Sequence, residues 1–330
     1  MLSRNGMSMR PAAAARDGAT SVRMYSSADM AASASVVDAV DALGAALRLG
    51  LDPESDAPRS RVRTETGDLL VMPSAMAEAS GVKLLTLTHD NPARGLPVIQ
   101  GVYVLFEGAD QSPVALLDGI ALTNLRTSAV SALAVRHLTP EGAAPASLTI
   151  FGTGPQARAH LGAMAAVRQL ARVTVVGRDP EALEWFVREG EVRELPLDTK
   201  LAGEGDPVAE ADLICCCTNA REPLFDGAAV RDDAVVVAMG AHTPDAREVD
   251  SRLVTRSTVV VESRSSALRE AGDVVLAIAE GAMSEEALMT LRELVTAPAE
   301  LPRRPRLFKS TGMPWEDLVV ANQIHRGGHR

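Results

Sequence analysis

One stretch decides the fold of this 330-residue chain: Phe151-Gly152-Thr153-Gly154-Pro155-Gln156-Ala157. It follows an apolar run, 148–151, and precedes a segment in which Ala157, Leu161 and Met164 share one helical face. Small residues between a strand and a helix let the backbone turn tightly, so that N–H groups at the helix N-terminus reach a pyrophosphate. The loop, in its GxGxxA form, therefore predicts a dinucleotide-binding Rossmann unit. A tight turn that binds no ligand is the alternative.

The end of the second strand of this unit indicates which dinucleotide binds. An acidic side chain there holds the ribose diol of NAD, whereas an arginine favours the 2′-phosphate of NADP. The position expected for the acid is Gly177, and Arg178 and Asp179 follow it. We therefore predict NADP (NADPH) and keep NAD as the alternative, because Asp179 is able to reach a ribose hydroxyl. Arg178 as an ordinary solvated residue is the other interpretation.

The segments on either side of the loop predict different architectures. Before it, short β-like runs alternate with turn formers, which is typical of an antiparallel sheet. These runs are 59–64, 69–72, 82–88, 98–106 and 114–117. Helical patterns over 29–49 and 120–138 flank them. After the loop, buried-type strands alternate with helical stretches, which predicts a doubly wound parallel sheet. Those strands are 173–176, 213–217, 235–239 and 259–261.

The predicted fold is α/β with two domains, as the chain length leads us to expect. A Rossmann domain spans 125–301, and a second, mainly antiparallel α+β domain spans 21–124 and is joined by the returning segment 302–330. The Pro-rich stretch 301–306 is the predicted linker. Residues 1–20 have no clear periodicity and are expected to be disordered, as a ragged start rather than a leader.

Composition excludes several classes of partner and site. The net charge of −10 argues against nucleic-acid binding, which needs a basic face. No apolar run reaches the roughly 18–20 residues that span a bilayer, so no membrane helix is expected. The three cysteines, Cys215 to Cys217, are adjacent. Because neighbouring strand residues point to opposite faces, these thiols neither converge on a metal nor form a disulfide framework, and a reducing cytoplasm fits them.

Lysine is rare in this chain, since 30 of its 33 basic residues are arginine. The exceptions are Lys83, Lys200 and Lys309. An ammonium has a tunable pKa that a guanidinium lacks, so the retained lysines are candidates for proton chemistry.

With the loop placed, four blocks of the sequence resemble the ornithine cyclodeaminase/mu-crystallin family, from about Arg59 to the C-terminal helix. The blocks are Met72-Pro73 with Lys83, Leu116-Leu117-Asp118-Gly119 with Leu122-Thr123 and Leu125-Arg126-Thr127, the loop at 151–157, and Phe308-Lys309-Ser310-Thr311-Gly312 with Glu316-Asp317. They occur in the family's order and at similar spacing. The resemblance implies a homodimer in which the second domain forms the interface and much of the substrate site.

The resemblance also assigns residues. Arg59, Lys83 and Arg126 match positions that bind the amino-acid substrate in the cyclodeaminases. Two guanidiniums suit an α-carboxylate, and a lysine at the reacting end is able to donate or accept a proton. From the residues alone, Arg59 reads as a strand-face residue, Lys83 as a gatekeeper at a sheet edge and Arg126 as a surface ion pair. Residues assigned to the cofactor are Thr127, Gly152, Thr153, Gly154, Gln156, Arg178, Asp179, Thr218, Met239, Gly240 and Ser310.

The sequence departs from the family pattern at one position. The cyclodeaminases carry an aspartate after the glycine of the block at 239–240, and His242 stands there instead. Ornithine cyclisation needs a group that positions and activates the side-chain amine, so the change argues against it. His242 is a candidate proton donor, together with Lys83, and a turn residue is the alternative. No metal site is expected.

The leading hypothesis is an NAD(P)H-dependent reductase of a small cyclic imino acid, such as Δ1-pyrroline-2-carboxylate or its six-membered homologue. One alternative is an ornithine cyclodeaminase or an alanine dehydrogenase-like enzyme. The other is a non-catalytic, NADP-dependent binding protein of the mu-crystallin type.

Overall fold

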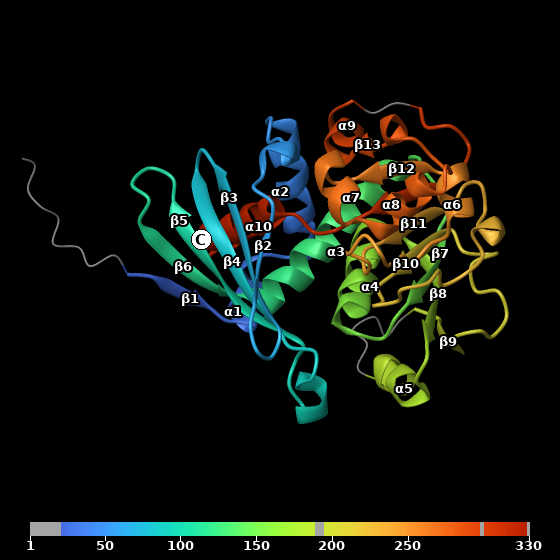
Figure 1. Cartoon of the computed structure of the whole chain (residues 1–330), viewed down its shortest axis with the longest axis horizontal. Helices are drawn as coiled ribbons and strands as arrows, with labels where there is room; N and C mark the ends of the chain where they lie inside the picture. The colour runs from blue at the N-terminus through green and yellow to red at the C-terminus, as the bar shows by residue number, and fades with distance from the viewer. Residues whose placement is uncertain (1–20, 189–194, 298–299, 329–330) are drawn as a thin grey trace, which may run out of the picture.

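The computed structural model describes residues 21–188, 195–297 and 300–328, so the predicted disordered start at 1–20 lies outside the described residues. Two sheets stand side by side, and α3 (Gly119–Leu138) runs from the first toward the second (Figure 1). Every predicted β-run is a strand, and the expected α/β fold is confirmed.

The first sheet has six strands in the order β1-β6-β5-β4-β3-β2. Neighbouring strands from β2 to β6 are antiparallel, as predicted, and only β1 joins its neighbour β6 in parallel. The strands are β1 (Arg23–Tyr25), β2 (Ser60–Arg63), β3 (Asp68–Met76), β4 (Ala79–Leu87), β5 (Ile99–Glu107) and β6 (Pro113–Asp118).

Helices cover one face of this sheet. α10 (Pro314–Gly327) contacts β3, β4 and β5, and α3 contacts β5 and α10. The helix expected over 29–49 is two helices, α1 (Ser27–Ser33) and α2 (Val36–Arg48), with 71° between them. The break occurs because Ser35 forms a capping box with Asp38 and so starts a new helix. Among the described residues no single helix is long and apolar enough to cross a membrane, although the bent pair α1–α2 passes the same test of length and composition.

The second sheet has eight parallel strands in the order β13-β12-β14-β11-β10-β7-β8-β9. The chain leaves β7 in one direction toward β8 and β9 and later returns to its other side with β10. The turn after β7 therefore lies where the strand order reverses, which is the usual ligand position in such sheets. The strands are β7 (Ala146–Phe151), β8 (Leu170–Gly177), β9 (Leu197–Leu201), β10 (Leu213–Cys216), β11 (Val235–Ala238), β12 (Thr258–Val261), β13 (Met289–Thr290) and β14 (Arg306–Lys309).

Both faces of this sheet are buried. Cys215 belongs to the apolar cluster that contains α3 and α4, and Cys216 belongs to the cluster on the opposite face. The cysteines thus fill a buried strand, as predicted, although Cys217 follows the strand and is only partly buried. The covering helices are α4 (Pro155–Val167), α5 (Pro180–Arg188), α6 (Ser251–Arg256), α7 (Arg264–Glu270), α8 (Gly272–Ala279) and α9 (Leu291–Thr296).

The C-terminal segment joins the two sheets. We expected 302–330 to belong with the first sheet after a linker at 301–306, but β14 lies in the second sheet between β11 and β12. Only after β14 does the chain cross over, so that α10 packs on the first sheet. An apolar strand such as Leu307-Phe308 gains most by burial on both faces, which only the parallel sheet provides. The domain limits at 124 and 301 remain predictions.

Candidate active site

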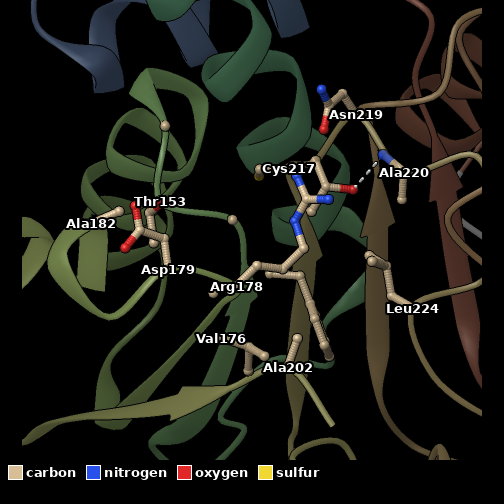
Figure 2. A pocket seen from close by; sticks show the side chains of 15 residues that line it. Thr153, Val176, Arg178, Asp179, Ala182, Ala202, Cys217, Asn219, Ala220 and Leu224 are labelled. Atoms are coloured by element: carbon tan, nitrogen blue, oxygen red, sulfur yellow. Dashed lines mark hydrogen bonds between the residues drawn. The ribbon is translucent and has the colours of Figure 1, made fainter.

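A cleft of about 690 Å³ opens at the carboxyl ends of β7, β8 and β10 (Figure 2). We call it the nucleotide cleft, because the predicted glycine loop forms its floor. Six of the residues predicted to bind the cofactor line it: Gly152, Thr153, Gly154, Arg178, Asp179 and Thr218.

The backbone of the loop has the form that a pyrophosphate requires. Gly152 has φ +112°, and a Cβ there would lie 2.4 Å from the carbonyl oxygen of Cys217, so no other residue fits without strain. Gly154 is the N-cap of α4 and has open space where a Cβ would be. No side chain caps α4 among the described residues, so its first N–H groups are left for an anion.

The end of β8 distinguishes Arg178 from Asp179. A Cβ on Gly177 would come within 3.0 Å of both Thr153 and Leu183, so an acidic side chain has no room there. Asp179 accepts a hydrogen bond from the backbone N–H of Glu181 at 3.0 Å, and its carboxylate thereby begins α5. Figure 2 shows Arg178 extended across the cleft. Both side chains line the cleft, but one carboxylate oxygen of Asp179 is already bonded to the first turn of α5.

A second cavity, of about 350 Å³, adjoins the nucleotide cleft. We call it the substrate cavity. Gly154, Cys217, Thr218 and Asn219 line both spaces, which therefore lie next to each other. The substrate cavity is lined by all the remaining residues of the predicted site: Arg59, Lys83, Arg126, Thr127, Gln156, Met239, Gly240, His242 and Ser310. Residues from both sheets thus meet at one place.

Lys83 lies on β4 opposite Met72 and Tyr103, on the sheet face that α10 covers. Its side chain is 0% exposed, and its Nζ lies 2.8 Å from Oδ1 and 2.7 Å from Oδ2 of Asp317. A buried ammonium without such a partner would be costly. Its interpretation as a gatekeeper at a sheet edge was wrong, because β4 is a central strand.

Arg126 is bound to the same helix. Its Nε lies 3.1 Å from Oδ1 of Asp317, and its Nη1 lies 2.8 Å from Oε2 of Glu316. The alternative of a surface ion pair on α3 was wrong, since the acids come from α10 and the guanidinium is buried. Glu316 and Asp317 were noticed in the sequence as part of the closing block but received no role. Only the fold brings Glu316 to Arg126, 190 positions earlier, and Asp317 to Lys83, 234 positions earlier.

These contacts set the charge states of the site. Burial, followed by repulsion from Arg126, lowers the pKa of Lys83 to about 8, although Asp317 acts in the opposite sense. Burial alone would lower the pKa of Arg126 as well, but Asp317 and Glu316 outweigh it and raise that pKa. The cavity therefore holds two guanidiniums, of Arg59 and Arg126, beside one lysine whose pKa is lowered to about 8.

Arg59 precedes β2 and reaches the chain segment before α10. Its Nη2 donates to the carbonyl oxygens of Thr311 at 2.8 Å and Gly312 at 2.7 Å, and lies 2.9 Å from Oε2 of Glu270. The first domain is thereby attached to the crossover of the C-terminal segment. Arg59 is thus more than the strand-face residue that its neighbours Arg61 and Arg63 suggested.

Two buried glutamates that the sequence analysis missed hold the loops of the cavity. Glu248 accepts hydrogen bonds from the N–H of Thr218 at 2.8 Å and of Gly240 at 2.6 Å. Glu262 accepts from Ser310 Oγ at 2.6 Å and from the N–H of Thr311 at 2.9 Å. The hydroxyl of Ser310 is therefore already bonded to protein. Neither glutamate stands in a motif that we recognised.

His242 lies at the exposed edge of the cavity, where its Nδ1 is 3.0 Å from the carbonyl oxygen of Gly240. The surrounding protein partly removes the ring from water and, with the positive charge of Arg59, lowers the pKa of His242. Lys309 has a different role: its Nζ binds Asp273 at 2.8 Å, and it does not line the cavity. Lys83 is thus the one lysine of the family blocks that lines this cavity.

Apart from Lys83, the strands of the first sheet line the substrate cavity with apolar side chains, namely Leu70, Met72, Leu85, Leu87 and Ile99. Thr123, Pro155, Thr311 and Gly312 complete the lining. Within the part of the chain that the structure describes, no carboxylate lines the cavity, because the acids near it lie behind Lys83 and Arg126. This arrangement fits a small molecule with an anionic end and a hydrocarbon remainder.

Comparison with known proteins places the chain. The model of the ornithine cyclodeaminase/mu-crystallin family matches residues 21–327. Δ1-pyrroline-2-carboxylate reductase of Colwellia psychrerythraea is 33% identical over 77% of this chain and 82% of its own length. Ketimine reductase mu-crystallin of Rattus norvegicus is 34% identical over 80% and 82%. The solved Δ1-pyrroline-2-carboxylate reductase of Thermococcus litoralis, in complex with NADH and L-proline, superposes with a TM-score of 0.85, at 28% identity over 93% of this chain and 97% of that one.

Proposed function

This chain belongs to the ornithine cyclodeaminase/mu-crystallin family, and we propose that it is an NAD(P)H-dependent reductase of a small cyclic imino acid. The reaction would convert Δ1-pyrroline-2-carboxylate to proline or Δ1-piperideine-2-carboxylate to pipecolate. The observation that carries the proposal is that Arg59, Lys83 and Arg126 line a cavity that shares four lining residues with the nucleotide cleft. The names of the relatives support it.

The two arginines and the lysine of the cavity have different roles toward the substrate. Arg59 and Arg126 bind its carboxylate, and the ion pairs with α10 keep the guanidinium of Arg126 charged and fixed. Lys83, as the ammonium, gives a proton to the ring nitrogen as the carbon of the C=N bond becomes saturated. A nicotinamide dinucleotide held by the residues of the nucleotide cleft would supply the hydride for that carbon. The apolar wall accommodates the ring methylenes.

The same cavity argues for reduction over ornithine cyclisation. A diamino acid carries a second ammonium, which requires an acidic partner when it leaves water. The wall that would face it is hydrocarbon, and His242 stands at the position of the family's aspartate. We therefore assign Lys83 as the proton donor. His242, whose ring lies at the exposed edge, becomes a contact at the cavity mouth.

Two further features belong to the proposal. We propose NADPH as the preferred cofactor, because Arg178 extends across the cleft while the carboxylate of Asp179 begins α5. We also propose a homodimer formed through the outer face of the first sheet. Strands β3 to β6 present a row of partly exposed apolar side chains there, and α2, α3 and α10 all lie on the opposite side (Figure 1). Such a face favours association. The cytoplasm remains the proposed compartment.

The test is turnover by the purified protein. Loss of NADPH absorbance with Δ1-pyrroline-2-carboxylate, and formation of proline in equal amount, would support the proposal. Proline formed from ornithine with catalytic amounts of cofactor would replace it with the cyclodeaminase assignment. Quenching of NADPH fluorescence without oxidation of the cofactor by any cyclic ketimine would favour the binding protein. Analytical ultracentrifugation of the same sample measures the molar mass in solution and so tests whether the protein is a dimer.

A further inference from the structure

Asp56 connects three elements near the substrate cavity without lining it. It follows η1 (Pro53–Ser55), stands three residues before Arg59 and is half-buried. Its Oδ1 accepts a hydrogen bond of 2.7 Å from Ser74 Oγ on β3, and its Oδ2 accepts one of 2.6 Å from the backbone N–H of Trp315 on α10. A carboxylate with these two contacts ties the loop, the sheet and the helix together.

The contact with Trp315 replaces a cap that α10 lacks. The N-cap residue of α10, Met313, makes no side-chain hydrogen bond to the first turn of the helix. The backbone N–H of Trp315 in that turn donates instead to the carboxylate of Asp56, 259 positions earlier in the chain. A negative charge at a helix N-terminus is also favoured by the helix dipole. Asp56 thus fixes the first turn of α10 from outside the helix.

That first turn carries Asp317, the partner of the proposed catalytic lysine, and Glu316, a partner of Arg126. Glu316 and Asp317 follow Trp315 directly, and Asp317 contacts both Lys83 and Arg126. All of these groups are buried, so a shift of the turn cannot be compensated by water. The position of Asp317 therefore depends on what holds Trp315.

In the single chain, Asp56 is also the member of this group that is partly exposed. A separate opening of about 450 Å³ is lined by Asp56, Ser74 and Gly81 and lies apart from the substrate cavity. The groups that face Asp56 are Ser74 from β3, Trp315 N–H and Asp317 from α10, and Tyr103 from β5. Burial, with a contribution from the charge of Asp317, raises the pKa of Asp56 to about 6.

We propose that Asp56 is a positioning residue for the reduction: its carboxylate holds the first turn of α10 and, through it, the ion pair between Asp317 and Lys83. The inference rests on the proposed function. Protonation of Asp56 removes the charge that faces the helix N-terminus, so kcat should fall on the acid side near pH 6. The titration of Lys83 should produce a separate fall on the basic side.

Two variants separate the charge of Asp56 from its hydrogen bonds. Asp56→Asn keeps an acceptor for Trp315 but has no charge, and Asp56→Ala has neither. We expect Asp56→Ala to lower kcat about 10- to 100-fold, since small misplacements near reacting groups are costly, while the KM for NADPH stays within about twofold. The Asp56→Asn variant should lose less activity than Asp56→Ala, and its pH profile of kcat should lack the fall on the acid side.

The matched control is Asp226→Asn, because Asp226 caps the surface turn η3 (Gly227–Ala229) and lines neither cavity. It should leave kcat and both limbs unchanged. A second control is Tyr103→Phe. The hydroxyl of Tyr103 is buried beside Gly81 without a hydrogen-bond partner among the described residues. Because positioning acts through Trp315, the Tyr103→Phe variant should keep the fall of kcat on the acid side of its pH profile. If this fall were absent in Tyr103→Phe, the proposal would be contradicted.

Melting temperature and ligand binding complete the experiment. The proposal is overturned if both Asp56 variants retain the native kcat and pH profile, or if kcat falls only in proportion to the folded fraction. Binding of L-proline to the NADP-loaded protein, measured by calorimetry between pH 5 and 9, gives a readout independent of turnover. If the native protein shows no reductase activity but Asp56→Asn alters the pH dependence of proline binding, the proposed function fails and the positioning role stands.

Discussion

The nucleotide cleft and the substrate cavity share four lining residues but are built in different ways. The cleft is formed mainly by backbone and small side chains at the ends of neighbouring parallel strands, within one domain. The cavity is lined by residues from Arg59 to Gly312, and two of its three cations, Lys83 and Arg126, form ion pairs with acids of α10. Binding in the cleft therefore depends on local backbone conformation, whereas chemistry in the cavity depends on ion pairs between distant elements.

This difference predicts how each region responds to change. A side chain introduced into the cleft should affect the cofactor and little else. A charge removed from the cavity should affect turnover while the cofactor still binds. Four measurements test the separation, beginning with the largest expected effect.

Replacement of Lys83 should have the largest effect. In Lys83→Met the proton donor is lost, while Asp317 keeps its contact with Arg126. We expect kcat to fall by about 10² to 10⁴, the usual contribution of a general acid, and NADPH to bind with an affinity within about threefold of native. Stopped-flow oxidation of NADPH and fluorescence titration measure the two quantities. Lys200→Met, on β9, is the control, and equal losses in both variants would contradict the role of Lys83.

Gly152→Ala should show the opposite pattern. The positive φ and the contact of its Cβ with the carbonyl of Cys217 would force the loop out of shape. We expect the Kd for NADPH to rise about 10- to 100-fold, with a smaller change in kcat at saturating cofactor. Gly162→Ala in α4 is the control, because a Cβ there has open space. If Gly152→Ala binds NADPH normally, the loop is not the pyrophosphate site.

Arg178→Ala tests the choice of cofactor within the cleft. Loss of one charge-assisted hydrogen bond to a 2′-phosphate should lower the ratio of kcat/KM for NADPH to that for NADH about tenfold. The affinity for NADH should remain nearly constant. Arg172→Ala, where the arginine pairs with Glu210 on the surface, is the control. An unchanged ratio would leave NADP without its proposed recognition element.

The smallest expected effect is that of pH on the native enzyme. The pKa of Lys83 is lowered to about 8, and the proposed donor is the protonated form, so activity is present below this pKa and is lost as pH rises through it. We expect kcat/KM for the imino acid to fall about fourfold between pH 7 and pH 8.5. The Kd for NADPH, measured over the same range, should change much less. A flat profile for kcat/KM would show that another group supplies the proton.

Much of the fold follows from periodicity and turn chemistry along the sequence. The runs before the loop predicted an antiparallel sheet and those after it a parallel one, and both are confirmed. The predictions were wrong where a local signal was overlooked or long-range pairing prevailed. Ser35 divides the expected first helix, and β14 enters the middle of the second sheet. Hydrophobic periodicity predicts where strands occur but not which strands pair, because pairing depends on contacts between residues that are distant in the sequence.

The candidate site also depends on contacts between distant residues that the sequence does not predict. A contiguous loop at 151–157 specified the nucleotide cleft, because its conformation depends on residues next to one another. Arg59, Lys83 and Arg126 were found through a family resemblance, and their grouping in one cavity came from the fold. The sequence alone predicted the strand, glycine loop and helix that form the nucleotide cleft, and it marked Lys83 as a lysine for proton chemistry. Only the tertiary structure decided that Asp317 would pair with that lysine, since charges interact through the space between them and not along the chain.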